Sequence, residues 1–277
     1  MEETNLEEKN TIIQILSSTK WKNCDRFVKI RSMSNYIYLC SYDNTKIILR
    51  IYGQLNSHCK QVLNMNEPME IISSYIIGKN ELGPQLYMIF KGGRIEEYIN
   101  DSVTLRELPL EKIICPELNR VIAQKLARFH SLNVPIPNDT MKVFETTKKI
   151  FESMFEFKHS LKTNFTNVWE WCAPLLCGIC NTGGMVFSHY DFSLNNILIK
   201  KTAINQTTKH DDIMFVDFEY SCYGFGESDI ATYFNTWDVD TSNPLGVLPY
   251  PKPTDEIKYN FVVDYLREKE ETTNELI

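Results

Sequence analysis

The sequence lacks the apolar segments that mark secreted and membrane-spanning proteins. No stretch approaches about eighteen consecutive apolar residues, the length that a membrane-spanning helix needs. The first ten residues carry four glutamates and no apolar centre, so they are not expected to act as a signal peptide. These absences predict a cytoplasmic protein without a membrane span.

A basic surface of the kind that binds nucleic acid is also missing. The 277 residues carry a net charge of −7, and no run of Lys and Arg is longer than three residues. Proteins that bind the phosphate backbone usually gather positive charge on one surface. Nucleic acid is therefore not expected as a partner, and the acidic surplus is typical of a solvated surface.

The cysteine pattern does not support a structural zinc site. The eight cysteines are scattered, and only Cys177 and Cys180 form a C-x-x-C pair. A structural zinc site needs four ligands. A second C-x-x-C or an H-x-x-x-H is missing, and Cys172 alone does not complete the set. Reduced thiols packed on a helix are the simpler interpretation.

The composition is that of a globular protein, with 43% hydrophobic and 23% charged residues. The first hundred residues favour strands, because residues 36–41 and 46–52 are rich in β-branched and aromatic side chains around a turn signal. Two more strands are predicted at 85–90 and 94–99, around Gly92 and Gly93, with a helix at 68–79 and a short helix ending near Leu16.

The rest of the chain is mainly helical in pattern. Leu118, Ile122, Leu126 and Phe129 recur at the spacing of one buried helical face, and Pro116 lies just inside its start. Further helices are predicted at 140–162 and 164–180. Short apolar runs at 185–187, 197–199 and 213–216 are predicted to be strands.

This contrast predicts two lobes. We expect an α+β fold with a small N-terminal lobe over residues 1–100 and a larger, mainly helical lobe over residues 101–277. The cleft between two such lobes is a natural place for a ligand.

An ordered set of polar residues follows one of the short apolar runs. His189, Asp191 and Asn196 form the pattern H-x-D-x-x-x-x-N, and Asp217 ends another apolar run 26 residues after Asp191. Phosphoryl transfer needs a carboxylate that accepts or orients the proton of an attacking hydroxyl, and ligands that hold magnesium against the nucleotide phosphates. Asp191 is predicted to fill the first role and Asn196 and Asp217 the second, while His189 ties the loop together by hydrogen bonds.

A structural interpretation stands beside this one. Asp and Asn are common in loops because they satisfy turns, and a lone histidine is more often a hydrogen-bonded structural residue. The ordered set in its strand–loop–strand context favours catalysis over turn chemistry.

These motifs resemble those of the choline/ethanolamine kinase family, which is related to aminoglycoside phosphotransferases and distantly to protein kinases. The most specific match is 217–223 together with 229–231, because Glu219 stands where protein kinases carry a glycine. Further matches lie at 33–35, 48–53, 81–87, 93–96 and 127–130. The resemblance covers most of residues 31–266. It implies a protein-kinase-like fold, ATP as co-substrate and Mg²⁺ as cofactor.

The resemblance also implies nucleotide contacts. Arg50 stands where the family has a basic residue that grips phosphate oxygens, and Glu70 would be its ion-pair partner. Ser34 and Asn35 would close over the phosphates. The hinge between the lobes, which would meet adenine, is expected at Ile89, Phe90 and Gly92. A solvated Arg, a solvated Glu and an apolar strand end are the alternatives.

The acceptor site has less support in the sequence. Glu219 resembles a family residue important for metal or substrate, and is equally explained as a capping acid. Tyr220 and Trp237, together with Tyr223 and Tyr233, are candidates for the aromatic faces that a quaternary ammonium needs. Each of these aromatic residues is also compatible with a plain core position.

Three features depart from the family pattern. Arg31 and Ser32 stand where the family has two glycines, which permit close backbone approach to phosphate. Thr236 stands where the family has a glutamate. The sequence ends 48 residues after Asp229, before the further helices that carry the family's aromatic acceptor walls.

We therefore expect transfer of the ATP γ-phosphoryl group to the hydroxyl of choline or ethanolamine, the entry step of phospholipid precursor synthesis. Two alternatives stay open. One is a kinase for another small hydroxyl compound such as an aminoglycoside. The other is a pseudokinase-like binding protein, which the altered loop and Thr236 favour and the intact Asp191, Asn196 and Asp217 oppose. The sequence leaves open the choice of alcohol and the formation of a homodimer.

Overall fold

The computed structural model describes residues 2–30, 32, 35–53, 66–139, 144–149, 162–182, 184–204, 206–238 and 252–275. The chain forms two compact units, Met1–Cys59 with Pro84–Asn100, and Lys60–Gly83 with Asp101–Ile277. Each unit has a hydrophobic core of its own. Helix α3 (Glu67–Lys79), which falls within the N-terminal lobe expected from the sequence, clusters with the second unit.

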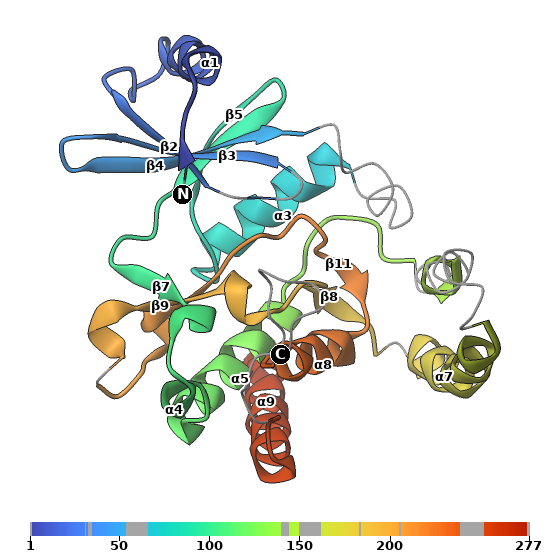
Figure 1. Ribbon diagram of the computed structural model, residues 1–277. Coiled ribbons are helices and arrows are strands. Elements are labelled where there is room, and N and C mark those ends of the chain that lie inside the picture. Colours follow the sequence, from blue (N-terminus) through green and yellow to red (C-terminus); the bar gives the residue numbers. More distant parts are fainter. Residues whose placement is uncertain are drawn as a thin grey trace. The chain divides into compact units, whose positions relative to one another are not determined.

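The first unit is a six-stranded antiparallel sheet with one helix packed on it (Figure 1). The strand order is β1-β2-β3-β4-β6-β5. Helix α1 (Leu6–Leu16) buries Ile12 and Leu16 against the sheet, and Asn5 caps its start in a capping box with Glu8. The strands are β1 (Glu2–Glu3), β2 (Arg26–Ile30), β3 (Asn35–Tyr42), β4 (Thr45–Tyr52), β5 (Leu86–Phe90) and β6 (Gly93–Glu97).

The predicted hairpin of β3 and β4 is confirmed, and the residues of its turn explain why it forms. Tyr42 pairs with Thr45, which leaves a two-residue loop, and Asp43 in that loop adopts a φ of 51°. Aspartate tolerates this left-handed region better than most residues. In β4 the buried Ile47 and Leu49 alternate with less buried neighbours, as a half-buried strand requires.

Strands β5 and β6 form a second hairpin within the first unit. They pair antiparallel, and Gly92 in the turn adopts a φ of 85°, which glycine accepts without steric cost. The two predicted strands are confirmed. Ile89, Phe90 and Gly92 lie on or beside this hairpin, and the expectation that they form the hinge stays a prediction.

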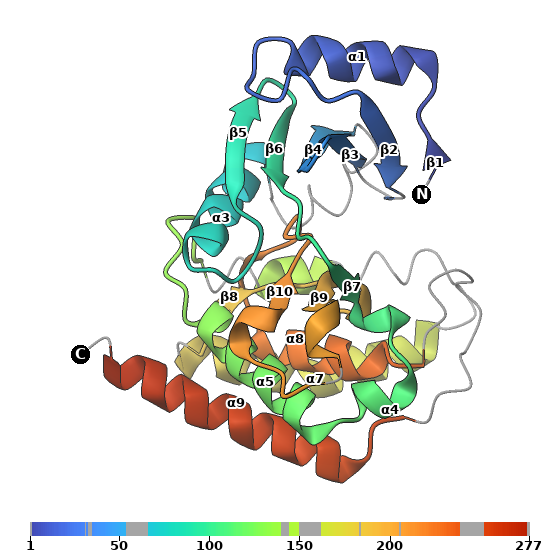
Figure 2. The ribbon, with the colours of Figure 1, turned by 90° about the vertical axis from the view of Figure 1, so that its left-hand side faces the viewer.

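The second unit surrounds helix α5 (Pro116–His130), the predicted amphipathic helix. Its buried face includes Leu126 and Phe129, and α9 (Asp255–Glu275) packs along it (Figure 2). Besides α3, the described part of this unit includes the helices α4 (Leu110–Ile113), α7 (Lys162–Thr182) and α8 (Gly226–Asn235), with 3-10 turns at Leu105–Glu107, Leu194–Asn196, Lys201–Ala203 and His210–Asp212. Cys177, one half of the C-x-x-C pair, lies on α7 and is exposed.

Two small antiparallel sheets complete the second unit. One has the order β10-β9-β7 and the other pairs β11 with β8. The apolar runs predicted as strands are confirmed in β8 (Val186–Ser188), β9 (Ile197–Lys200) and β10 (Ile213–Phe215). The partners β7 (Ser102–Thr104) and β11 (Cys222–Gly224) were not predicted, because neither segment is a continuous apolar run in the sequence.

The helices of the described residues include none that is both long and apolar enough to cross a membrane. The predicted helix at 164–180 is confirmed within α7, whereas most of the helix predicted at 140–162 lies outside the described residues.

Candidate active site

The H-x-D-x-x-x-x-N residues lie on the loop between β8 and β9. Strand β10 then runs back along β9 with Phe215 opposite Ile197. This pairing brings Asp217 back to Asn196, and the Val216 amide donates to the Asn196 carbonyl at 3.0 Å. The predicted metal ligands Asn196 and Asp217, although 21 positions apart, therefore lie on adjoining strand ends.

His189 is completely buried beneath this loop, and both of its ring nitrogens are bonded. Because a carbonyl can only accept, Nε2 carries the hydrogen and donates to the Val216 carbonyl at 3.0 Å. The other nitrogen, Nδ1, then accepts from the Asp191 amide at 3.3 Å. His189 thus links the end of β10 to the backbone of Asp191 and has no nitrogen left for proton transfer.

Asn196 holds the side chain of Asp191. Its Nδ2 group donates to the Asp191 carbonyl oxygen at 2.9 Å and to Oδ2 of the Asp191 carboxylate at 2.7 Å. An amide nitrogen has two hydrogens, and both are used here. The amide oxygen of Asn196 is consequently the atom that can face a cation.

The electrostatics around Asp191 reflect a gathering of carboxylates. Burial raises the pKa of Asp191 to about 6, and the negative charges of Asp217 and Glu219 act in the same direction. The nearby His189 and the hydrogen bond from Asn196 oppose that rise. A bound cation would relieve the repulsion among these carboxylates.

Two residues of the site adopt a positive φ, which is uncommon for residues other than glycine. Tyr190 has a φ of 61° and Asp217 a φ of 67°. Such strained conformations persist where the surroundings hold them, and they cluster at functional sites. Phe218 anchors the Asp217 turn in the core, and Gly83 makes room for it, since an added Cβ would lie 2.6 Å from the Phe218 ring.

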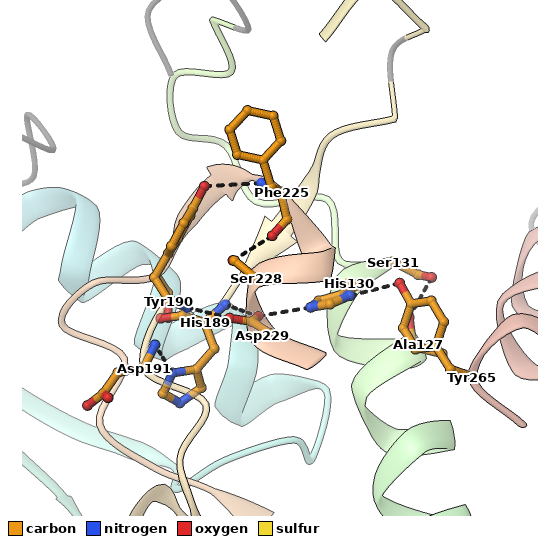
Figure 3. A network of polar contacts seen from close by, with 11 residues as sticks. Ala127, His130, Ser131, His189, Tyr190, Asp191, Phe225, Ser228, Asp229 and Tyr265 are labelled. Atoms are coloured by element: carbon orange, nitrogen blue, oxygen red, sulfur yellow. Dashed lines mark hydrogen bonds and ion pairs between the residues drawn. The ribbon is translucent and has the colours of Figure 1, made fainter. Parts of the chain in front are cut away.

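Asp229, at the start of α8, holds the loop from behind (Figure 3). Its fully buried carboxylate accepts hydrogen bonds from the amides of His189 at 2.6 Å and Tyr190 at 2.8 Å. It also pairs with His130 Nε2 at 2.9 Å. In the sequence, Asp229 and His130 stand only within segments that match the family and have no predicted role. Asp229 is 40 positions from His189 and 99 positions from His130, and no local sequence pattern links residues so far apart.

The candidates for the acceptor site differ in solvent exposure. Glu219 is 5% exposed and close enough to influence Asp191, and Tyr220 is partly exposed. Trp237 is 1% exposed and packs against Tyr233 and Phe234, so the structure favours the core position that the sequence left open. Its proposed role toward the acceptor stays a prediction.

The nucleotide candidates of the first unit centre on a buried charge cluster. Arg50 lies opposite Arg94 on neighbouring strands, and Glu96 bridges them, 3.4 Å from Arg50 Nε and 2.5 Å from Arg94 Nε. Sequence reasoning had not named Arg94 or Glu96 as members of the site. Glu70 is 2% exposed and belongs to the second unit, so its pairing with Arg50 stays a prediction.

The remaining nucleotide candidates are less informative. Asn35 is buried, and its side chain accepts from the Gly53 amide at 3.4 Å. Ser34 lies outside the described residues. Ile89 is 51% exposed on β5, and the roles of Ile89, Phe90 and Gly92 toward the nucleotide stay predictions.

A sequence model of the family described as choline/ethanolamine kinase matches residues 29–276. The chain belongs to the choline/ethanolamine kinase family. It is similar to a Homo sapiens choline/ethanolamine kinase, 26% identical over 261 residues that cover 85% of this chain and 61% of the relative. The chain therefore spans less than two thirds of the length of such curated relatives.

Solved structures of the family share the fold. A choline kinase from Cryptosporidium parvum Iowa II superposes with a TM-score of 0.66 at 18% identity, over 95% of this chain and 80% of that chain. A Plasmodium vivax ethanolamine kinase gives 0.65 at 21% identity, over 97% and 76%. The expected protein-kinase-like α+β fold is confirmed.

The donor set suits the magnesium ion that the choline/ethanolamine kinase family implies. Within the described residues, no group of three or more His, Cys, Asp or Glu side chains could hold a metal ion by itself. Magnesium is usually held by one or two carboxylates together with substrate phosphates and water. The amide oxygen of Asn196 and the carboxylate of Asp217 are hard oxygen donors of that kind.

Proposed function

We propose that this chain transfers the γ-phosphoryl group of ATP to the hydroxyl of ethanolamine or choline, a step of phospholipid precursor synthesis. The observation that carries the proposal is the arrangement of Asp191 and Asn196, joined by two hydrogen bonds, with Asp217 returned beside them by β10. Membership of the choline/ethanolamine kinase family supports the same reaction.

Asp191 would orient and deprotonate the attacking hydroxyl. Its carboxylate is fixed by Asn196 through Oδ2 and by the loop backbone through His189. A pKa of about 6 keeps the group ionised at neutral pH while leaving it a better base than an exposed aspartate. Geometry and basicity therefore both support Asp191 as the proposed general base.

Asn196 and Asp217 would hold Mg²⁺, which supplies charge neutralisation on the nucleotide phosphates when it is bound. The left-handed backbone of Asp217 and the buried Phe218 beside it would hold the carboxylate in place for that role. Pre-placed ligands of this kind lower the reorganisation that catalysis requires.

Glu219 and Tyr220 are the residues we assign to the ammonium end of the alcohol. They follow Asp217 directly, and the charge of Glu219 is felt at Asp191. A carboxylate and one aromatic face can replace part of the hydration that an ammonium loses on binding. We keep the expectation of a cytoplasmic location, which cell fractionation would test.

The test is a substrate panel with ATP, with and without magnesium, scored by mass spectrometry of the phosphorylated product. Ethanolamine, choline and an aminoglycoside are supplied separately to the wild type and to Asp191→Asn. Magnesium-dependent product from either amino alcohol, absent with the variant, is expected. Product from the aminoglycoside alone would contradict the proposed acceptor, and nucleotide binding without any product would contradict the proposed reaction.

A further inference from the structure

A chain of buried hydrogen bonds runs from α9 to the catalytic loop, all of it within the second unit (Figure 3). The Tyr265 hydroxyl lies 2.8 Å from His130 Nδ1, and His130 Nε2 lies 2.9 Å from Asp229 Oδ2. Asp229 in turn holds the backbone of His189 and Tyr190. The chain joins α9, α5 and α8 to the residues that precede Asp191.

The positions of the hydrogens along this chain follow from its two ends. Two amides and one imidazole nitrogen converge on the Asp229 carboxylate, which acts as acceptor for all three. The Asp229 carboxylate therefore favours a hydrogen on His130 Nε2, and in a neutral ring with that hydrogen Nδ1 is an acceptor. The Tyr265 hydroxyl supplies the hydrogen bond that this acceptor needs.

The phenol is suited to that role. Burial raises the pKa of Tyr265, and the charges of Glu227 and Asp229 raise it further, so the hydroxyl stays protonated. The His130 ring has little freedom to turn. Gly226 leaves just enough space for it, because an added Cβ would lie 3.0 Å from Nδ1.

We propose that Tyr265 is a positioning residue that fixes the Nε2–H tautomer of His130 and, through Asp229, the backbone that carries Asp191. The inference rests on the proposed phosphoryl transfer. The tautomer matters because a ring with its hydrogen on Nδ1 would turn a lone pair toward the Asp229 carboxylate and repel it. Partners of this kind orient a functional group without touching the substrate.

Helix α9 offers a matched control on the same pair of helices. Arg128 Nε lies 2.5 Å from Glu268 Oε1, and this ion pair also joins α5 to α9. Among the described residues, this ion pair shares no hydrogen bond with the groups of the chain. Arg128→Gln removes a docking contact and leaves the chain intact, whereas Tyr265→Phe removes one hydroxyl and leaves the docking of α9 intact.

The experiment compares these two variants with the wild type in steady-state kinetics, thermal unfolding and ¹⁵N spectroscopy of the histidine rings. Tyr265→Phe is expected to lower kcat about tenfold, within the range for groups that act through another residue, with the KM for ATP within about threefold. Arg128→Gln should keep kcat within about twofold. The His130 signals, assigned with His130→Gln, should show protonated Nε2 in the wild type and a mixed tautomer in Tyr265→Phe.

The readouts separate this inference from a structural role and from the proposed function. An unchanged kcat in Tyr265→Phe would overturn the inference. It would also be overturned if Arg128→Gln lost as much kcat as Tyr265→Phe and the loss in each variant followed the fall in its melting temperature. Wild-type His130 with its hydrogen on Nδ1 would overturn it as well. A wild type without kinase activity would overturn the proposed function, and the tautomer comparison would then decide the positioning role by itself.

Discussion

The catalytic loop and the acceptor candidates are close in sequence but are held very differently. Asp191 sits on a loop whose backbone is bonded by Asp229 and His189, and Asn196 grips its carboxylate. On the acceptor side, Glu219 and Tyr220 follow Asp217 in a turn, while the aromatic Trp237 is in the core. The comparison teaches that the catalytic candidates are held by hydrogen bonds from buried groups, whereas the candidates for the acceptor site are few side chains, one of which lies in the core.

The largest expected effect comes from Asp191→Asn. The change keeps the shape of the side chain and removes the proton-accepting charge, so kcat should fall on the order of a thousandfold while ATP affinity changes only a few-fold. Product formation and calorimetric ATP titration measure the two quantities. Asp255→Asn, at a fully exposed carboxylate, is the control and should behave as wild type. A near wild-type rate in Asp191→Asn would remove the contrast between the two regions.

Asp217→Ala should weaken magnesium-dependent ATP binding at least about 100-fold. Residues that only support a metal ligand already contribute up to about that factor, and Asp217 is proposed as a ligand itself. The variant loses the anionic ligand of the proposed magnesium site, and Asn196 is neutral. Calorimetric titrations of ATP with and without magnesium give the comparison. An equal gain in affinity from magnesium in variant and wild type would contradict the ligand assignment.

On the acceptor side we expect ethanolamine to be used better than choline. A trimethylammonium group cannot donate hydrogen bonds and depends on aromatic faces, whereas a primary ammonium can bond to Glu219. Of the aromatic candidates, Tyr223, Tyr233 and Trp237 are buried at 9% exposure or less, so Tyr220 is the one left to offer a face. The kcat/KM for ethanolamine should exceed that for choline about tenfold, or about 1.4 kcal/mol. The reverse preference would show that a competent aromatic cage exists.

The catalytic loop should also carry a stability cost that depends on pH. The pKa of Asp191 is about 6 in the folded protein against a usual 3.8, so its ionisation disfavours folding above pH 6 and has no effect well below pH 4. Asp191→Asn should therefore raise the free energy of unfolding by about 2–3 kcal/mol at pH 7.5. The gain should shrink as the pH falls from 6 toward 4. Denaturant unfolding without nucleotide or metal tests this, and a pH-independent gain would contradict it.

The smallest expected effect comes from Trp237→Phe. In the described structure the indole Nε1 is buried without a hydrogen-bond partner, so the change loses packing contacts and no hydrogen bond. The free energy of unfolding should fall by about 1–2 kcal/mol, with the KM for both alcohols unchanged. A raised KM for the alcohols at wild-type stability would instead indicate that Trp237 contributes to acceptor binding. The difference between the catalytic loop and the acceptor candidates would then be smaller.

Much of the local structure could be predicted from the sequence, because its causes are local. The 3–4 spacing around Leu126, the first-turn Pro68 of α3 and the two-residue turn at Asp43 each depend on neighbours within one turn or one hairpin. His189, Asp191 and Asn196 could be found for the same reason, since one short loop carries all three.

The tertiary structure alone decided which distant groups support that loop. Asp229, His130 and Tyr265 meet beneath it although no sequence period connects them, because a buried carboxylate must find its donors wherever the packing of helices brings them. The same holds for Trp237, since a tryptophan suits a cage and a core equally in sequence. Only the packing of Tyr233 and Phe234 around its ring placed it in the core.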